Sequence, residues 1–218
     1  ALFDSTGLIS GTIGGGVTEA QVQDYAISSS LTKKSGYLHF SLSKDVSHRY
    51  EAICGGKISI LVDANPFSHI SVFEAVRQSL FENTSVVLIT MVTAIRDPEV
   101  LINRYWMTRD SKPQLPDEFM EQIEPEVINM LEFPGRNDFR KLELSIPDEE
   151  PASIFFLELL LPPDHLVIAG AGHIGKALSH LGKLLDFDVT VIDDREEFAN
   201  SSNLPDADHI IVNNIGEA

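Results

Sequence analysis

The chain contains little cysteine, little tryptophan and few basic residues. Among its 218 residues there is one cysteine and one tryptophan, and 16 Lys plus Arg face 33 Asp plus Glu. A single cysteine excludes an internal disulfide, and no signal peptide is visible, so we expect a cytoplasmic protein. The net charge of −17 repels phosphate backbones. Because no basic stripe with interleaved aromatic residues is present either, the sequence argues against nucleic-acid binding.

Long apolar runs are also absent. The longest lies near residues 154–161 and is interrupted by Glu158, whereas a membrane helix needs about 18 apolar residues. Apolar residues nevertheless make up 43% of the chain, which is enough for a folded core. We therefore expect one or two globular domains and no membrane segment.

Charge is unevenly distributed along the chain. Residues 1–60 hold five acids and five bases, whereas residues 110–218 hold 23 acids and seven bases. An anionic ligand is therefore expected to bind near the neutral first quarter. The acidic stretch 117–132 is expected to be a solvated helix face.

The order of predicted elements repeats within residues 1–163. The first copy comprises a hairpin at residues 2–10, a helix from about Thr18, and strands at residues 37–42 and 57–63. Thr18 and Gln21 predict a capping box, and a helix over 68–81 joins the copies. The second copy comprises residues 86–92, 104–108, 117–131, 140–146 and 154–161. In this alignment the strand 86–92 has no counterpart before Ala1, so we expect a missing strand at the amino end.

The two copies differ in their glycines. Copy one has Gly14, Gly15 and Gly16 before its helix and Gly55 and Gly56 before its last strand, and copy two has none at these places. The repeated scaffold therefore does not itself require these glycines. The loop 11–16 leads into a helix, so it places unpaired N–H groups where a phosphate can bind, or it is only a strained turn.

Residues 164–218 predict the beginning of a doubly wound fold, in which a strand, a G-x-G-x-x-G turn, a helix and a second strand follow one another. Gly170 permits the turn, Gly172 lets a pyrophosphate approach, and Gly175 lets the helix pack on the strand. Asp193 ends the second strand and is expected to bind a ribose, which favours NAD over NADP. The fold class is thus α/β: an N-terminal mixed α+β domain (1–163, start missing), then a truncated Rossmann-like parallel sheet (164–218, C-terminal part missing).

Three further residues each have two interpretations. His173 either bonds a ligand or is an exposed histidine at a helix start. Glu19 either stabilises the first helical turn or holds a ring edge with N–H groups, as in a pterin or purine. Cys54 either is a small buried residue or, beside Gly55 and Gly56, is a thiolate that ligates a soft metal or handles sulfur.

These segments, taken together, resemble the XdhC/CoxI family of xanthine dehydrogenase accessory factors. The resemblance rests on the segments 11–19, 54–56, 166–175 and 191–195, and it spans nearly the whole chain. It implies a maturation factor that binds molybdenum cofactor, assists its sulfuration and inserts it into apo xanthine dehydrogenase or a related hydroxylase. A cysteine desulfurase is the implied second partner, and we expect a homodimer.

The two lines of inference combine into one hypothesis. The pterin phosphate binds the N–H groups of Gly14 to Gly16, Glu19 engages the pterin edge, and Cys54 faces the molybdenum or its sulfur. An NAD-dependent oxidoreductase, or a subunit of xanthine dehydrogenase that uses the turn 170–175, is the rival interpretation. A module that senses NAD without chemistry is a third.

Overall fold

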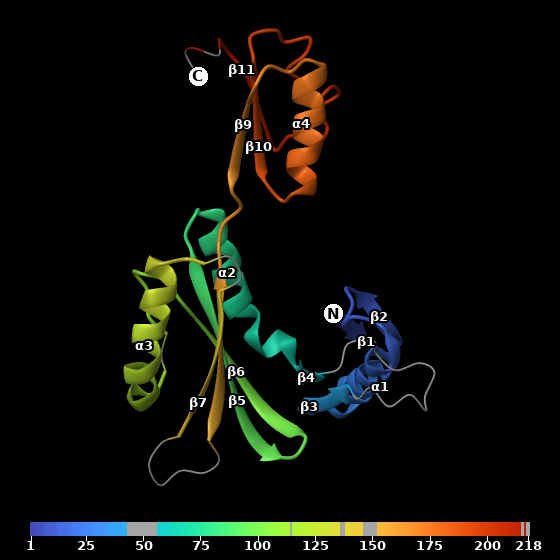
Figure 1. Cartoon of the computed structure of the whole chain (residues 1–218), viewed down its shortest axis with the longest axis vertical. Helices are drawn as coiled ribbons and strands as arrows, with labels where there is room; N and C mark the ends of the chain where they lie inside the picture. The colour runs from blue at the N-terminus through green and yellow to red at the C-terminus, as the bar shows by residue number, and fades with distance from the viewer. Residues whose placement is uncertain (43–55, 114, 136–137, 146–151, 215, 217–218) are drawn as a thin grey trace. The chain divides into compact units, whose positions relative to one another are not determined.

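The structure is a computed structural model that describes residues 1–42, 56–113, 115–135, 138–145, 152–214 and 216. The chain divides into two compact units (Figure 1). Unit 1 comprises Ala1–Ser79 and Ser85–Leu160, and unit 2 comprises Leu80–Thr84 and Leu161–Ala218. We describe each unit by itself.

Unit 1 begins with a short hairpin and a helix. Strands β1 (Leu2–Asp4) and β2 (Gly7–Ser10) pair antiparallel, and α1 (Gly16–Thr32) follows. Strands β3 (Ser35–Leu42) and β4 (Gly56–Val62) then pair antiparallel. Val22 and Ala26 lie one helical turn apart on α1, and both pack with Val62 of β4. This apolar spacing fixes which face of α1 covers the strands.

The rest of unit 1 repeats this order around a larger core. The connecting segment is a 3-10 turn, η1 (Pro66–His69), followed by α2 (Ile70–Phe81). The second copy consists of β5 (Val86–Arg96), β6 (Glu99–Met107), α3 (Asp117–Glu132), β7 (Phe139–Leu144) and β8 (Ser153–Leu160). The strands form an antiparallel sheet in the order β4-β3-β6-β5-β8-β7.

The repeat has the predicted elements but a different alignment. A hairpin, a helix and two strands follow one another in both copies, because β5 and β6 form a hairpin as β1 and β2 do. The strand 86–92 therefore corresponds to β1. The expectation that the strand 86–92 has no counterpart was wrong. The sequence predicted only residues 104–108 of β6, so the hairpin of β5 and β6 was not recognised.

The start of α1 also differs from the prediction. Gly15, with φ +81°, precedes the first helical residue, and no side chain caps the helix. Thr18 is therefore the third residue of α1, so the Thr18–Gln21 capping box was wrong. Glycines with positive φ allow the chain to turn into the helix earlier than the Thr18 signal indicated.

Helix α3 is amphipathic, as its sequence predicted. Four apolar residues recur at helical spacing and are buried in one cluster with Phe155 of β8, namely Phe119, Ile123, Val127 and Met130. Most of its acidic residues lie on the opposite, solvent-facing side. The acidic side of α3 is thus the solvated helix face that the charge pattern of residues 117–132 indicated.

The two copies meet where β3 lies beside β6. Ser35 pairs with Val100 and Gly36 with Glu99, and the Tyr37 amide donates to the Pro98 carbonyl oxygen at 2.9 Å. A small core of Val92, Val100 and Ile102 lies at this join. Among the described residues, β3 and β6 form no further residue pairs.

Unit 2 has the predicted α/β order. Strands β9 (His165–Ala169), β10 (Asp188–Asp193) and β11 (His209–Val212) are parallel in the order β11-β10-β9, and α4 (His173–Leu184) connects the first two. Gly175, Ser179 and Gly182 form the buried face of α4. Together the two units confirm the α/β fold class, with a mixed α+β part followed by a Rossmann-like part.

Candidate functional site

The glycine loop 11–16 binds a carboxylate from its own helix. Glu19 Oε1 accepts hydrogen bonds from the Ile13 amide and the Thr12 hydroxyl, both at 3.0 Å. The Gly14 amide donates to the Thr12 hydroxyl oxygen at 3.1 Å. The loop is therefore a cradle of donors around one oxyanion, and the oxyanion present is the Glu19 side chain.

The electrostatics of Glu19 agree with this geometry. The hydrogen bond from the Ile13 amide, with those from Thr12 and Gly15, holds the pKa of the Glu19 carboxyl below its usual value. Donors that stabilise a carboxylate also suit a phosphate oxygen. A ligand phosphate on the same amides would have to displace Glu19, which would then be released toward the rest of that ligand.

The glycines of this loop are needed for backbone conformation. Gly14, Gly15 and Gly16 have φ of +109°, +81° and +76°, and a Cβ on Gly14 or Gly16 would meet nothing within 4 Å. The surrounding space is therefore open, and only the left-handed φ excludes other residues. An open, donor-rich loop is what a phosphate group needs.

The turn 170–175 in unit 2 uses its glycines as the sequence predicted. Gly170 has φ +107°, and the Gly175 Cβ position lies 1.8 Å from the Gly170 carbonyl oxygen. No side chain fits at Gly175, so α4 packs directly on the turn. A Cβ on Gly172 would meet nothing within 4 Å, which leaves the turn open to a ligand beside the first amide groups of α4.

Asp193 holds this turn from inside the protein. Its side chain is 2% exposed, and Oδ2 accepts a hydrogen bond from the Ala171 amide at 2.7 Å. Arg195 donates from its amide and its Nε to Oδ1, each at 2.9 Å, and from Nη2 to Oδ2 at 2.8 Å. The Arg195 side chain and the Ala171 amide hold the pKa of Asp193 well below its usual range. A ribose contact at Asp193 therefore requires one of these bonds to be exchanged.

Asn203 also holds this turn in place, and no sequence signal identified this role. Its Nδ2 donates to the Ala171 carbonyl oxygen and to the Phe198 carbonyl oxygen, each at 2.9 Å. Asn203 thus holds the carbonyl side of Ala171, and Asp193 holds the amide side. Since 32 residues separate Asn203 from Ala171, no spacing signal could identify it.

The remaining predicted site residues have separate outcomes. His173 is the first residue of α4 and is exposed, so its role as a ligand contact stays a prediction. Gly56 begins β4 opposite Leu42 and is exposed. Cys54 and Gly55 lie outside the described residues. The proposed approach of residues 54–56 to the loop 11–16 therefore also stays a prediction.

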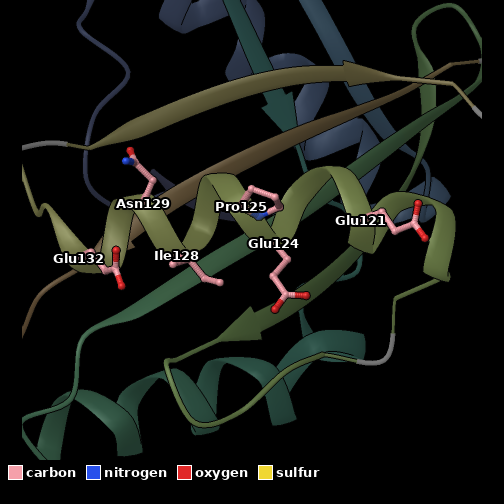
Figure 2. A pocket seen from close by; sticks show the side chains of 6 residues that line it. All are labelled: Glu121, Glu124, Pro125, Ile128, Asn129 and Glu132. Atoms are coloured by element: carbon pink, nitrogen blue, oxygen red, sulfur yellow. The ribbon is translucent and has the colours of Figure 1, made fainter.

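A shallow hollow of about 530 Å³ lies along the outer face of α3 (Figure 2). Its residues all come from this helix, and they combine glutamates with Pro125 and Ile128. Glu124 is already paired with Lys112. In the described part of the chain, no group of three or more His, Cys, Asp or Glu side chains is arranged to hold a metal ion. None of the described helices has both the length and the apolar character needed to cross a membrane.

The last quarter of the chain matches a family model, and nearly the whole chain matches a known fold. Residues 166–216 match the family model of the XdhC Rossmann domain. This match covers the turn 170–175, Asp193 and Asn203, which are the residues that build the site in unit 2. No curated protein matches the chain.

The fold of nearly the whole chain is also known from a crystal structure. A protein described as a xanthine dehydrogenase from Bacillus halodurans superposes with a TM-score of 0.68 at 22% sequence identity. The match covers 94% of this chain and 55% of that protein. The two share a fold, and the chain spans about half the length of that relative.

Proposed function

We propose that this chain, whose residues 166–216 match the XdhC Rossmann domain, acts in the maturation of xanthine dehydrogenase or a related molybdenum hydroxylase. In this role it binds molybdenum cofactor, assists its sulfuration and passes it to the apoenzyme. The match of residues 166–216 is the observation that carries the proposal. The fold shared with a protein described as a xanthine dehydrogenase supports it.

The donor set of the loop 11–16 fits the phosphate end of such a cofactor. The Ile13 amide already binds a carboxylate there, and the positive φ of Gly14 to Gly16 keeps the backbone open to approach. We infer an exchange in which the phosphate takes the amide donors and Glu19 turns to the N–H groups of the pterin edge. The cofactor supplies the molybdenum centre that the client enzyme uses for hydroxylation.

Cys54 has the chemistry to protect the metal end. A thiolate is a soft ligand and a good acceptor for sulfur chemistry, and Cys54 is the single thiol of the chain. In this proposal Cys54 faces the molybdenum or its terminal sulfur while Gly55 and Gly56 leave room for the ligand. The partners are the apo hydroxylase, a cysteine desulfurase and a second copy of this chain, in the cytoplasm.

The experiment that tests this function measures cofactor binding and delivery of the cofactor to the apoenzyme together. The full chain is titrated with molybdenum cofactor, and the loaded protein is mixed with apo hydroxylase. Wild type is expected to bind pterin and molybdenum and to produce active hydroxylase. Cys54→Ala is expected to bind pterin but to deliver less active enzyme, while Ser41→Ala, an exposed change on β3, behaves as wild type. Equal affinity and equal delivery by Cys54→Ala would reject the role of the thiol.

One observation favours a second candidate function. The open turn at Gly172 beside the amino end of α4 suits a dinucleotide, as an NAD-dependent oxidoreductase or an NAD-using subunit of xanthine dehydrogenase requires. Calorimetry with NAD and NADH separates the candidates. Tight binding accompanied by hydride transfer supports the oxidoreductase, binding without chemistry supports an NAD sensor, and no binding supports the maturation factor alone.

A further inference from the structure

A second hollow lies in unit 1 at the join between the two copies. It has a volume of about 200 Å³ and is bounded by the start of β3, the end of β4, η1 and β6. It lies beside the residue pairs that join β3 to β6, because Ser35, Glu99 and Val100 are among its lining residues. Buried Val100 and Ile102 supply its apolar wall. The hollow is large enough for a small ligand.

Charged side chains surround this hollow in pairs, with one cation left over. Asp63 is paired with Arg104 and both side chains are largely buried, at 13% and 12% exposed. Glu99 is paired with Lys34 at 2.9 Å. Lys33 also borders the hollow, and it has no ion-pair partner among the described residues. Lys33 and Lys34 balance Asp63 and Glu99 in the lining of the hollow, and Arg104, the ion-pair partner of Asp63, adds one further positive charge in a chain whose net charge is −17.

The position of Lys33 is one that glycine usually occupies. Lys33 follows α1 in the left-handed conformation, with φ +59°, and its amide donates to the Ser29 carbonyl oxygen at 2.8 Å. A side chain is disfavoured there, and glycine is the common residue. The chain nevertheless places an ammonium group at this helix end, beside the hollow.

His69 supplies a fixed polar group in the wall. Its ring donates a hydrogen bond to the Ile102 carbonyl oxygen, and its side chain borders the hollow. Burial, helped by the charge of Arg104 and opposed by Asp63 and by the Ile102 bond, holds the pKa of His69 below its usual value. His69 is therefore neutral at pH 7 while the hollow holds no anion.

We propose that this hollow is a binding site for a small oxyanion, a carboxylate or a phosphate, whose counter-ion is Lys33 and whose second contact is His69. The Asp63–Arg104 pair positions the wall, and the two paired acids do not repel the ligand because their charges are balanced. A bound anion favours the protonated imidazole, so binding takes up a proton at His69. Affinity for the ionised ligand therefore falls as the pH rises through the His69 pKa of the bound state. This site is independent of the function proposed above.

The test titrates the full chain with inorganic phosphate, and separately with acetate, while the imidazole signals of its histidines are followed by NMR. The His69 signal is assigned by its absence in His69→Gln. Saturable shifts of His69 and tighter binding at lower pH are expected. Tighter binding of phosphate than of acetate identifies the ligand group as a phosphate, and tighter binding of acetate identifies it as a carboxylate.

Lys33→Gly is the decisive variant, because glycine is favoured at φ +59° and the variant is expected to fold at least as well as wild type. Its affinity is expected to fall about tenfold, the ratio for one charge-assisted hydrogen bond. Asn83→Gly, with φ +56°, controls for the backbone change, and Lys176→Gln on α4 controls for the charge. His69→Gln is expected to bind with a weaker pH dependence. An unchanged affinity in Lys33→Gly, or no saturable shift with either anion, would overturn the proposal.

Discussion

The two glycine turns of this protein look alike in sequence and differ in what their glycines do. In the loop 11–16, Gly14 and Gly16 have open space around them and are required only by positive φ. In the turn 170–175 Gly175 has no space for a Cβ, because the Gly170 carbonyl oxygen would lie 1.8 Å away. The first turn thus depends on backbone conformation, and the second on close packing between a helix and a turn.

The two turns also differ in which carboxylate holds them. Glu19 lies on the helix that directly follows its loop, so that contact is local and only partly buried. Asp193 reaches Ala171 from the next strand across 22 residues and is buried. A ligand can exchange with the half-buried carboxylate of Glu19 more readily than with Asp193, whose bonds maintain the fold of unit 2.

The largest effect is expected from Gly175→Ala. The added Cβ cannot avoid the Gly170 backbone, so unit 2 should lose about 3 kcal/mol or more of unfolding free energy. Gly172→Ala is the matched control, since its Cβ meets nothing within 4 Å and its stability should be nearly unchanged. Chemical denaturation of both variants measures the difference. Equal losses of unfolding free energy in the two variants would show that the turn can accommodate a Cβ at Gly175, which would contradict the close packing described above.

The second largest effect is expected from Asp193→Asn, which removes the charge that pairs with Arg195 and weakens the bond to the Ala171 amide. In wild type the folded-state pKa of Asp193 lies well below its ordinary value of 3.8. Its contribution to stability is therefore fully present above about pH 4 and is lost as the pH falls below that value.

Thermal melts between neutral and acidic pH measure this contribution. Asp193→Asn should melt several degrees lower at neutral pH, and the gap to wild type should shrink in acid. Asp194→Asn is the control, because Asp194 is largely exposed and lies 3.9 Å from Arg195. A gap that stays constant with pH would contradict the role of the Asp193 charge.

A smaller effect is expected from Gly16→Ala in unit 1. The cost is conformational alone and should be about 1–2 kcal/mol of unfolding free energy, because the residue must keep φ near +76°. Gly56→Ala has open space and no positive φ, so it should cost much less. If denaturation gives equal costs, the left-handed backbone of the loop is not what requires glycine.

The smallest effect on stability is expected from Glu19→Gln, since Glu19 is near the surface and its contacts are local. Its effect on binding should be larger. Without the negative charge in the cradle, inorganic phosphate should bind the amides of Gly14 to Gly16 severalfold more tightly, as measured by their NMR shifts. Gln23 on the same helix gives the control variant Gln23→Glu. Weaker phosphate binding in Glu19→Gln would show that the carboxylate supports the site rather than occupying it.

The sequence predicted most elements because their signals are local. The strand β8 lies within one residue of the predicted 154–161, and α3 begins at the predicted Asp117 and ends one residue beyond the predicted Leu131. Periodic apolar residues and helix-start signals are sufficient for such elements. The turn 170–175 was also predicted, because each glycine has a fixed place between a strand and a helix.

Contacts between distant residues account for what was missed. The strand β6 runs over Glu99–Met107 because it pairs with β5 along its length, and pairing of this kind leaves no mark in a short window. The bonds of Ala171 to Asp193 and Asn203 join residues 22 and 32 positions apart. The roles of Asp193 and Asn203 as supports of the turn can therefore be seen only in the folded structure.

The narrow join between β3 and β6 also determines how unit 1 opens. Two residue pairs and the Tyr37–Pro98 hydrogen bond connect the copies along the sheet, whereas nine residue pairs connect β5 with β6. Separation at the join breaks far fewer backbone pairs than separation of β5 from β6. Amide protons at Gly36 and Tyr37 should therefore exchange with solvent through a partial opening that leaves β5 and β6 protected.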